Sequence, residues 1–95
     1  MPEIHIERHH ALGLAEARKL ALRWAESARD KLAMDCAYEQ GEAADLLRFS
    51  RAGVDGEMQV TGTQFLIDAR LGLLLGSLKG RIESEIVKRL DALLS

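Results

Sequence analysis

Hydrophobic and polar residues follow two different periods along the chain. Apolar residues recur every three or four positions over residues 14–33 and again over residues 77–94, which predicts two amphipathic helices. They recur at every second position over residues 4–7 and in four stretches between residues 34 and 71, which predicts five short strands. The predicted order of elements is therefore β-α-β-β-β-β-α.

Capping and turn residues mark the ends of these elements. Gly13 and Ser77 stand where the two helices should begin, and Glu16 is placed to reach the free backbone amides of the first helical turn. Stretches that contain glycine separate the last four strands, and we expect turns or loops at residues 40–42, 53–56 and 61–62. Connections this short join antiparallel neighbours, so the four strands should form a meander.

A sheet with one apolar face and two helices with one apolar face bury each other when both helices lie on the same side. We therefore predict an α+β fold, with one antiparallel sheet and both helices on one face, in a single domain over residues 1–95. The first strand should pair with the fifth, at the edge of the meander. This is the topology of the TATA-binding-protein-like and START-like helix-grip folds, and a shared fold does not carry a function with it.

The residues predicted to face the interior are apolar or weakly polar. They are Ile4, Ile6, Trp24, Met34, Cys36, Tyr38, Leu47, Phe49, Met58, Val60, Phe65, Ile67 and Leu71. We expect almost complete burial of Trp24, Phe49, Phe65, Ile67, Ile82 and Ile86, and exposure of Arg48, Gln64, Asp68 and Arg70. The inward set contains no carboxylate, histidine or serine. Catalysis by acid–base or nucleophilic groups needs titratable side chains held together in a cleft, so we expect neither an enzyme nor a cofactor.

Composition fits one soluble domain. The chain has 95 residues, of which 47% are hydrophobic and 29% are charged. No apolar run approaches the roughly 18 residues of a transmembrane helix, and the N-terminus shows no export signal. Cys36 is the one cysteine, which excludes an internal disulfide and fits a cytoplasmic protein with an inert core thiol.

Charge and histidine spacing argue against two further classes of binding site. Residues 34–77 carry seven acidic and three basic side chains, the wrong sign for a sheet that binds nucleic acid. His5, His9 and His10 are the only local cluster of possible metal ligands. On a strand His5 and His9 would lie about 13 Å apart, too far to share one metal ion. We expect exposed histidines and no metal site.

A ligand cavity is one alternative use of the inward residues. It would be lined by Trp24, Tyr38, Phe49, Met58 and Phe65, between the helices and the sheet. A chain of 95 residues leaves little volume once its core is filled, so these side chains also fit an ordinary core.

The stretch from Leu71 to Leu78 contains five leucines and no charge. A turn from strand to helix points successive side chains in different directions, so Leu73, Leu74 and Leu75 cannot all reach the same core. Either they wrap the corner inside the monomer, or some of them form an exposed contact surface. We predict that at least one of the three is exposed.

Lys79 and Arg81 fall in the first turn of the last predicted helix. Cations at this end oppose the helix dipole. They either help to hold an anion at the free amides or are solvated without a ligand.

Several stretches, in this order and spacing, resemble one bacterial protein family. They are Ile4-His5-Ile6, His10-Ala11-Leu12-Gly13 with Glu16-Ala17-Arg18, Phe49-Ser50-Arg51-Ala52-Gly53-Val54-Asp55-Gly56, and Leu71-Gly72-Leu73-Leu74-Leu75-Gly76-Ser77-Leu78-Lys79-Gly80-Arg81-Ile82-Glu83. The chain resembles the polyhydroxyalkanoic acid system proteins, found beside storage-polyester genes. One departure is Ser77, where proline is equally expected. The resemblance brings no catalytic motif with it.

Three function classes remain open. The first is a non-enzymatic accessory protein of polyhydroxyalkanoate metabolism, which the resemblance implies, acting in the cytoplasm by contact with the polymer granule or its proteins. The second is a module that binds a small hydrophobic ligand such as an acyl or hydroxyacyl group. The third is a homodimeric scaffold without a ligand.

Overall fold

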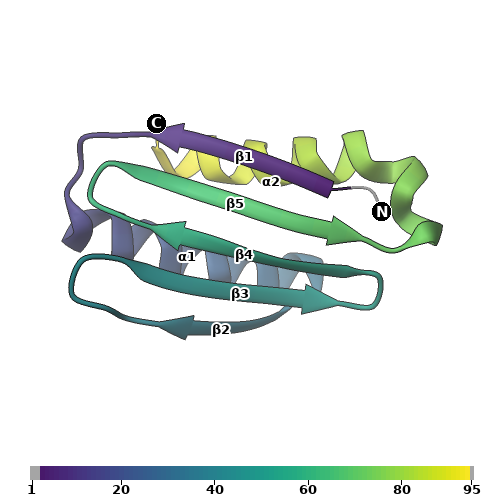
Figure 1. Ribbon diagram of the computed structural model, residues 1–95, viewed down its shortest axis with the longest axis horizontal. Coiled ribbons are helices and arrows are strands. Elements are labelled where there is room, and N and C mark those ends of the chain that lie inside the picture. Colours follow the sequence, from purple (N-terminus) through teal and green to yellow (C-terminus); the bar gives the residue numbers. More distant parts are fainter. Residues whose placement is uncertain (1–2, 95) are drawn as a thin grey trace.

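The computed structural model describes residues 3–94, which form a five-stranded sheet with two α-helices behind it (Figure 1). The elements are β1 (Glu3–His9), α1 (Leu14–Leu32), β2 (Asp35–Glu39), β3 (Asp45–Arg51), β4 (Val54–Val60), β5 (Gln64–Leu71), the 3₁₀-helix η1 (Leu73–Leu78) and α2 (Lys79–Leu94). The predicted α+β class and the order β-α-β-β-β-β-α are confirmed.

Every strand pair in the sheet is antiparallel, and the strand order is β1-β5-β4-β3-β2. The first strand therefore pairs with the fifth, as predicted. The register places Ile6 opposite Ile67, Ile67 opposite Met58, and Met58 opposite Leu47. This continuous apolar row is why the sheet buries one face and leaves the other in water.

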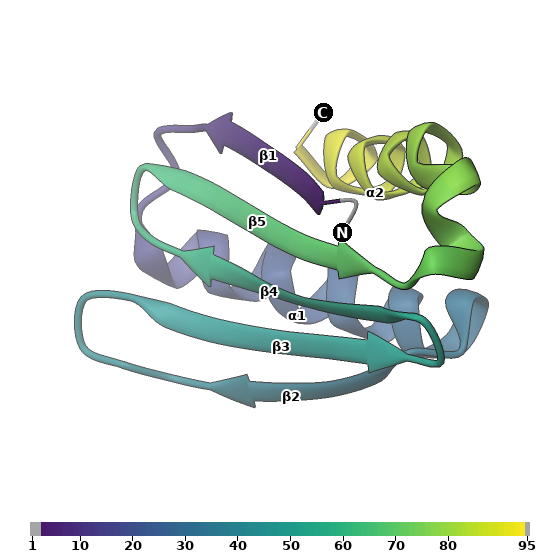
Figure 2. The same ribbon diagram turned by 45° about the vertical axis from the view of Figure 1, so that its right-hand side comes forward.

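Both helices cover the same face of the sheet (Figures 1 and 2). α1 packs against β2, β3 and β4, while α2 packs against β1. The buried stripe of α1 consists of Ala17, Ala21, Trp24 and Ala28. Its alanines let the helix backbone approach the strands closely, and Trp24 fills the centre, with its ring 5.2 Å from that of Phe49. No helix in the described part of the chain is long and apolar enough to cross a membrane.

Eight of the ten residues for which burial or exposure was predicted behave as expected. Trp24, Phe49, Phe65, Ile67 and Ile86 are buried, and Arg48, Asp68 and Arg70 are exposed. Ile82 and Gln64 are both half-buried instead. Ile82 packs against the core and also lines a surface groove.

The predicted loop at residues 53–56 is wrong, because β3 and β4 are joined by Ala52 and Gly53 alone. Gly53 has a φ of 83°, which suits so tight a turn. Gly56 lies inside β4 opposite Phe49, where a Cβ would come within 2.6 Å of the Phe49 ring. This glycine makes room for a core ring.

The starts of both helices differ in part from the prediction. Gly13 does precede α1, but Glu16 pairs with Lys19 at 3.2 Å instead of capping the first turn. Ser77 does not begin α2, because it lies inside η1 and α2 starts at Lys79. The 3₁₀-helix lets the chain reverse direction after β5.

Candidate functional site

The leucine corner, which we define as Leu73–Leu78, presents apolar side chains to water. Leu73 is 87% exposed and Leu74 is 92% exposed, so the prediction that at least one of the three leucines is exposed is confirmed. Leu75 is half-buried and packs against the core. The corner is attached to the fold, because Gly72 N–H donates to the Gly53 carbonyl at 2.9 Å and Leu75 rests on Gly53.

An apolar groove of about 320 Å³ opens beside this corner. It lies between the end of α1, the β3–β4 turn, η1 and α2. Its lining residues are Leu32, Met34, Arg51, Ala52, Val54, Leu75, Leu78, Arg81, Ile82, Glu85 and Ile86. Met34, Val54 and Ile86 are buried, so they form its floor. The sequence placed Met34 on the inward face but gave no sign that a groove forms there.

Two cations stand at this groove. Arg81 is exposed, and its side chain makes no hydrogen bond or ion pair with any residue from 3 to 94. Arg51 is exposed and donates to the Leu32 carbonyl at 2.8 Å. Glu85 is the one acidic residue of the lining, and its carboxylate lies 3.8 Å from Arg89.

The structure separates the two residues of the candidate anion site. Lys79 and Arg81 are both exposed near the start of α2. The Lys79 amide donates to the Gly76 carbonyl, so that amide is not free to bind an anion. Arg81 lines the groove whereas Lys79 does not, so the structure separates the two cations.

The residues of the predicted cavity are packed against one another. Trp24, Phe49, Met58 and Phe65 are buried in one core cluster, and Tyr38 packs at its margin. The groove described above is lined by none of these five side chains. A ligand bound between these five side chains stays a prediction, and such binding would require the core side chains to move apart.

A buried carboxylate is the feature that the sequence reasoning missed. Asp45 lies on the inward face of β3, and its side chain is completely buried. It accepts two hydrogen bonds from Arg18 at 2.6 and 2.9 Å, one from Tyr38 Oη at 2.6 Å, and one from the Gly41 amide at 2.9 Å. The expectation of no inward carboxylate is therefore wrong. The alternation of side chains along the strand could have revealed this carboxylate. Asp45 precedes inward-facing Leu47 by two positions, so both side chains lie on the same face of the sheet.

The partners of Asp45 set its charge state. Hydrogen bonds from the Arg18 guanidinium hold the pKa of Asp45 well below its usual range. Burial and the hydrogen bond to Asp45 raise the pKa of Tyr38 well above its usual value. The ionised Asp45 carboxylate accepts all of these hydrogen bonds. Because the donors come from α1 and from the β2–β3 region, the carboxylate links the β2–β3 connection to α1.

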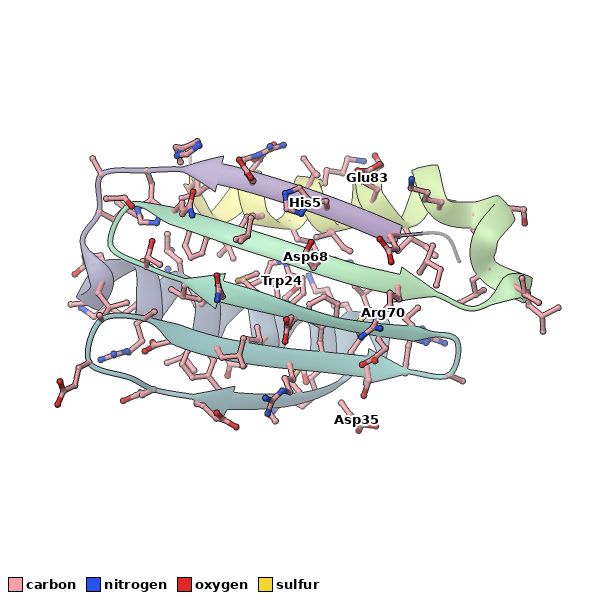
Figure 3. The ribbon with its side chains drawn as sticks, in the orientation of Figure 1. His5, Trp24, Asp35, Asp68, Arg70 and Glu83 are labelled. Atoms are coloured by element: carbon pink, nitrogen blue, oxygen red, sulfur yellow. The ribbon has the colours of Figure 1, made fainter. Side chains whose placement is uncertain are left out.

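The histidines do not converge on one point. His5 and Asp68 lie side by side on the open face of the sheet, where His5 Nδ1 is 2.5 Å from the Asp68 carboxylate (Figure 3). His9 is exposed, and His10 is half-buried with its ring 4.7 Å from that of Phe65. Among residues 3–94, no group of three or more histidine, cysteine or acidic side chains is placed to hold a metal ion.

His10 should make the fold less stable as the pH falls. Its Nδ1 accepts a hydrogen bond from the Leu12 amide at 3.1 Å. Burial lowers the pKa of His10 from 6.5, and a weaker interaction with the Gln64 backbone opposes this shift. A lowered folded pKa means that the unfolded chain binds the proton more readily. Stability is therefore present above pH about 6.5 and is lost as the pH falls, by at most about 1.4 kcal/mol per pH unit.

Denaturant unfolding at pH 5.5, 6.5 and 7.5 tests this expectation. His10→Asn keeps an acceptor for the Leu12 amide and removes the titration, so it should flatten the loss. His5→Asn should steepen it, because hydrogen bonds to Asp68 and Glu7 raise the pKa of His5 and favour the charged folded form at low pH. Equal pH dependence in the wild type and His10→Asn would contradict the assignment.

Cys36 lies half-buried on β2. Its thiol makes a weak contact with the Ala25 carbonyl at 3.7 Å, and burial raises the pKa of the thiol. A thiol in this state is a poor nucleophile, as expected for a core cysteine.

Comparison with known proteins gives one match. A family model described as "Putative polyhydroxyalkanoic acid system protein" covers residues 4–94. No curated protein matches the chain, and no solved structure does. The match covers the fold from the second residue of β1 to the end of α2, including the leucine corner and the groove.

Proposed function

Since the chain belongs to the family of polyhydroxyalkanoic acid system proteins, we propose that it is a non-enzymatic accessory protein of bacterial polyhydroxyalkanoate metabolism. It acts by direct contact with the storage-polyester granule. The proposal places the protein in the cytoplasm, at the granule surface. The observation that supports it is the exposure of Leu73 and Leu74 on a corner fixed to the sheet.

The two leucines supply the driving force for this contact. Covering one leucine side chain is worth about 1.5–3 kcal/mol. Leu73 and Leu74 contribute almost nothing to the core, because both are nearly fully exposed. An apolar polyester surface would cover them both, so adsorption gains free energy that folding does not use.

Replacing both leucines with lysine should abolish adsorption while leaving the fold intact. Leu73→Lys combined with Leu74→Lys should reduce binding to polyhydroxybutyrate particles at least ten-fold, because about 3–6 kcal/mol of burial is lost. The free energy of unfolding should change by less than about 0.5 kcal/mol, as for other surface substitutions. Co-sedimentation with particles measures the first quantity and denaturant unfolding the second.

Leu22→Lys is the matched control. Leu22 is 41% exposed on α1, away from the leucine corner, so its replacement should leave adsorption unchanged. Adsorption that survives the double replacement would overturn the proposal. Sedimentation velocity checks the competing scaffold function: a wild-type dimer that the double variant converts to a monomer, without any particle binding, would favour self-association.

A further inference from the structure

The apolar groove is suited to a ligand of one particular shape. Its volume of about 320 Å³ lies at the lower end of the range for small-molecule sites, enough for a single narrow chain. Its buried floor of Met34, Val54 and Ile86 offers only aliphatic atoms and a thioether. A narrow aliphatic chain matches such a floor.

The charges at the groove favour an anionic end on that chain. Arg51 and Arg81 both line it, and the Arg81 guanidinium has no partner among the described residues. The opposing charge is Glu85, whose carboxylate is paired with Arg89. The local balance is therefore positive, and a guanidinium binds a carboxylate in a planar, two-point geometry.

We propose that the groove binds one aliphatic chain that ends in a carboxylate, with the chain over Met34 and Ile86 and the carboxylate at Arg81. The groove adjoins the leucine corner, because Leu75 and Leu78 line the groove. When the leucine corner lies on a polyester surface, a polymer chain end at that surface can therefore reach the groove. The identification of that chain as a polyester acid end rests on the proposed function. A free alkanoate has the same chemistry and is the other source.

Methyl NMR of the full chain tests the site with sodium octanoate as the probe. The methyl signals of Met34, Val54 and Ile86 should shift in a saturable way, with a dissociation constant of about millimolar for so open a groove. Those of Ile4 and Ile6, which do not line it, should stay unchanged. Signals that do not move at the floor would overturn the proposal.

Two variants separate the apolar and the charged contributions. Ala52→Trp should fill the groove from its exposed turn and remove binding of both octanoate and 1-octanol. Arg81→Gln should weaken octanoate about three-fold and leave 1-octanol unchanged. Lys79→Gln is the matched control, because Lys79 is exposed close by but does not line the groove, and octanoate affinity should stay the same. Equal losses in Arg81→Gln and Lys79→Gln would overturn the carboxylate assignment.

A trimer of 3-hydroxybutyrate with a free carboxylate distinguishes the two sources. If the trimer shifts the same methyl signals at least as strongly as octanoate, the ligand is a polyester chain end. If octanoate alone does so, the ligand is a free alkanoate. The Leu73→Lys and Leu74→Lys double variant should still bind octanoate. Failure of adsorption and failure of the groove are therefore measured independently.

Discussion

Replacing Phe65 with alanine is expected to lower the free energy of unfolding by about 3–5 kcal/mol. Phe65 is fully buried on β5, opposite Val60 and next to the ring of His10. Removing its ring leaves a cavity inside the core cluster, and the lost contacts and the cavity together set the cost. A domain of this size has only about 5–15 kcal/mol of stability, so the loss is a large share of it.

Fluorescence of Trp24, the one tryptophan of the chain, reports unfolding in this experiment. Leu66→Ala is the control, because Leu66 is the next residue of β5 and faces the other side of the sheet, half-buried. It should cost only about 1 kcal/mol. Equal losses for the two variants would show that the register of β5 is wrong.

Replacing Asp45 with alanine is expected to cost about 3 kcal/mol, at the lower end of the range for breaking a buried ion pair. The substitution leaves Tyr38 Oη and the Gly41 amide without their acceptor and separates Arg18 from its only described counter-ion. Arg18 is partly exposed, so water recovers some of its interaction, which keeps the loss from being larger.

Two further variants control this prediction. Tyr38→Phe removes one of the hydrogen bonds to the carboxylate and should cost about 1.5 kcal/mol. Asp35→Ala removes an exposed aspartate of the adjacent strand and should change stability by less than about 0.5 kcal/mol. If Asp45→Ala behaves like Asp35→Ala, the buried network does not stabilise the fold.

Asp45 also predicts behaviour in acid. Its folded pKa is below the ordinary value of 3.8, so its contribution is present above pH about 4 and is lost as the pH falls further. Unfolding measured between pH 5 and 2.5 should show a steep loss of stability in the wild type. Asp45→Asn, which cannot ionise, should show a shallower loss. Parallel curves would contradict the assignment.

The periodicity of the chain determined the fold class, the order of elements and the pairing of β1 with β5. It succeeded because one-faced strands and helices have few ways to bury their apolar sides together. It failed at residues 53–56, where Gly53 makes the turn but Gly56 makes room for the Phe49 ring. A glycine has the same appearance in the sequence for both purposes, and only the packing tells them apart.

The sequence by itself also determined that a leucine run at a corner exceeds what one core can bury. Only the tertiary structure decided that Leu73 and Leu74 are the most exposed leucines of this run while Leu75 rests on Gly53. The same holds for Asp45, whose partner Arg18 lies 27 positions away, and for the groove, whose walls come from α1, the β3–β4 turn, η1 and α2. Local spacing fixes the direction in which a side chain points. Its partner is fixed by contacts between elements that are distant in the sequence, which no local pattern encodes.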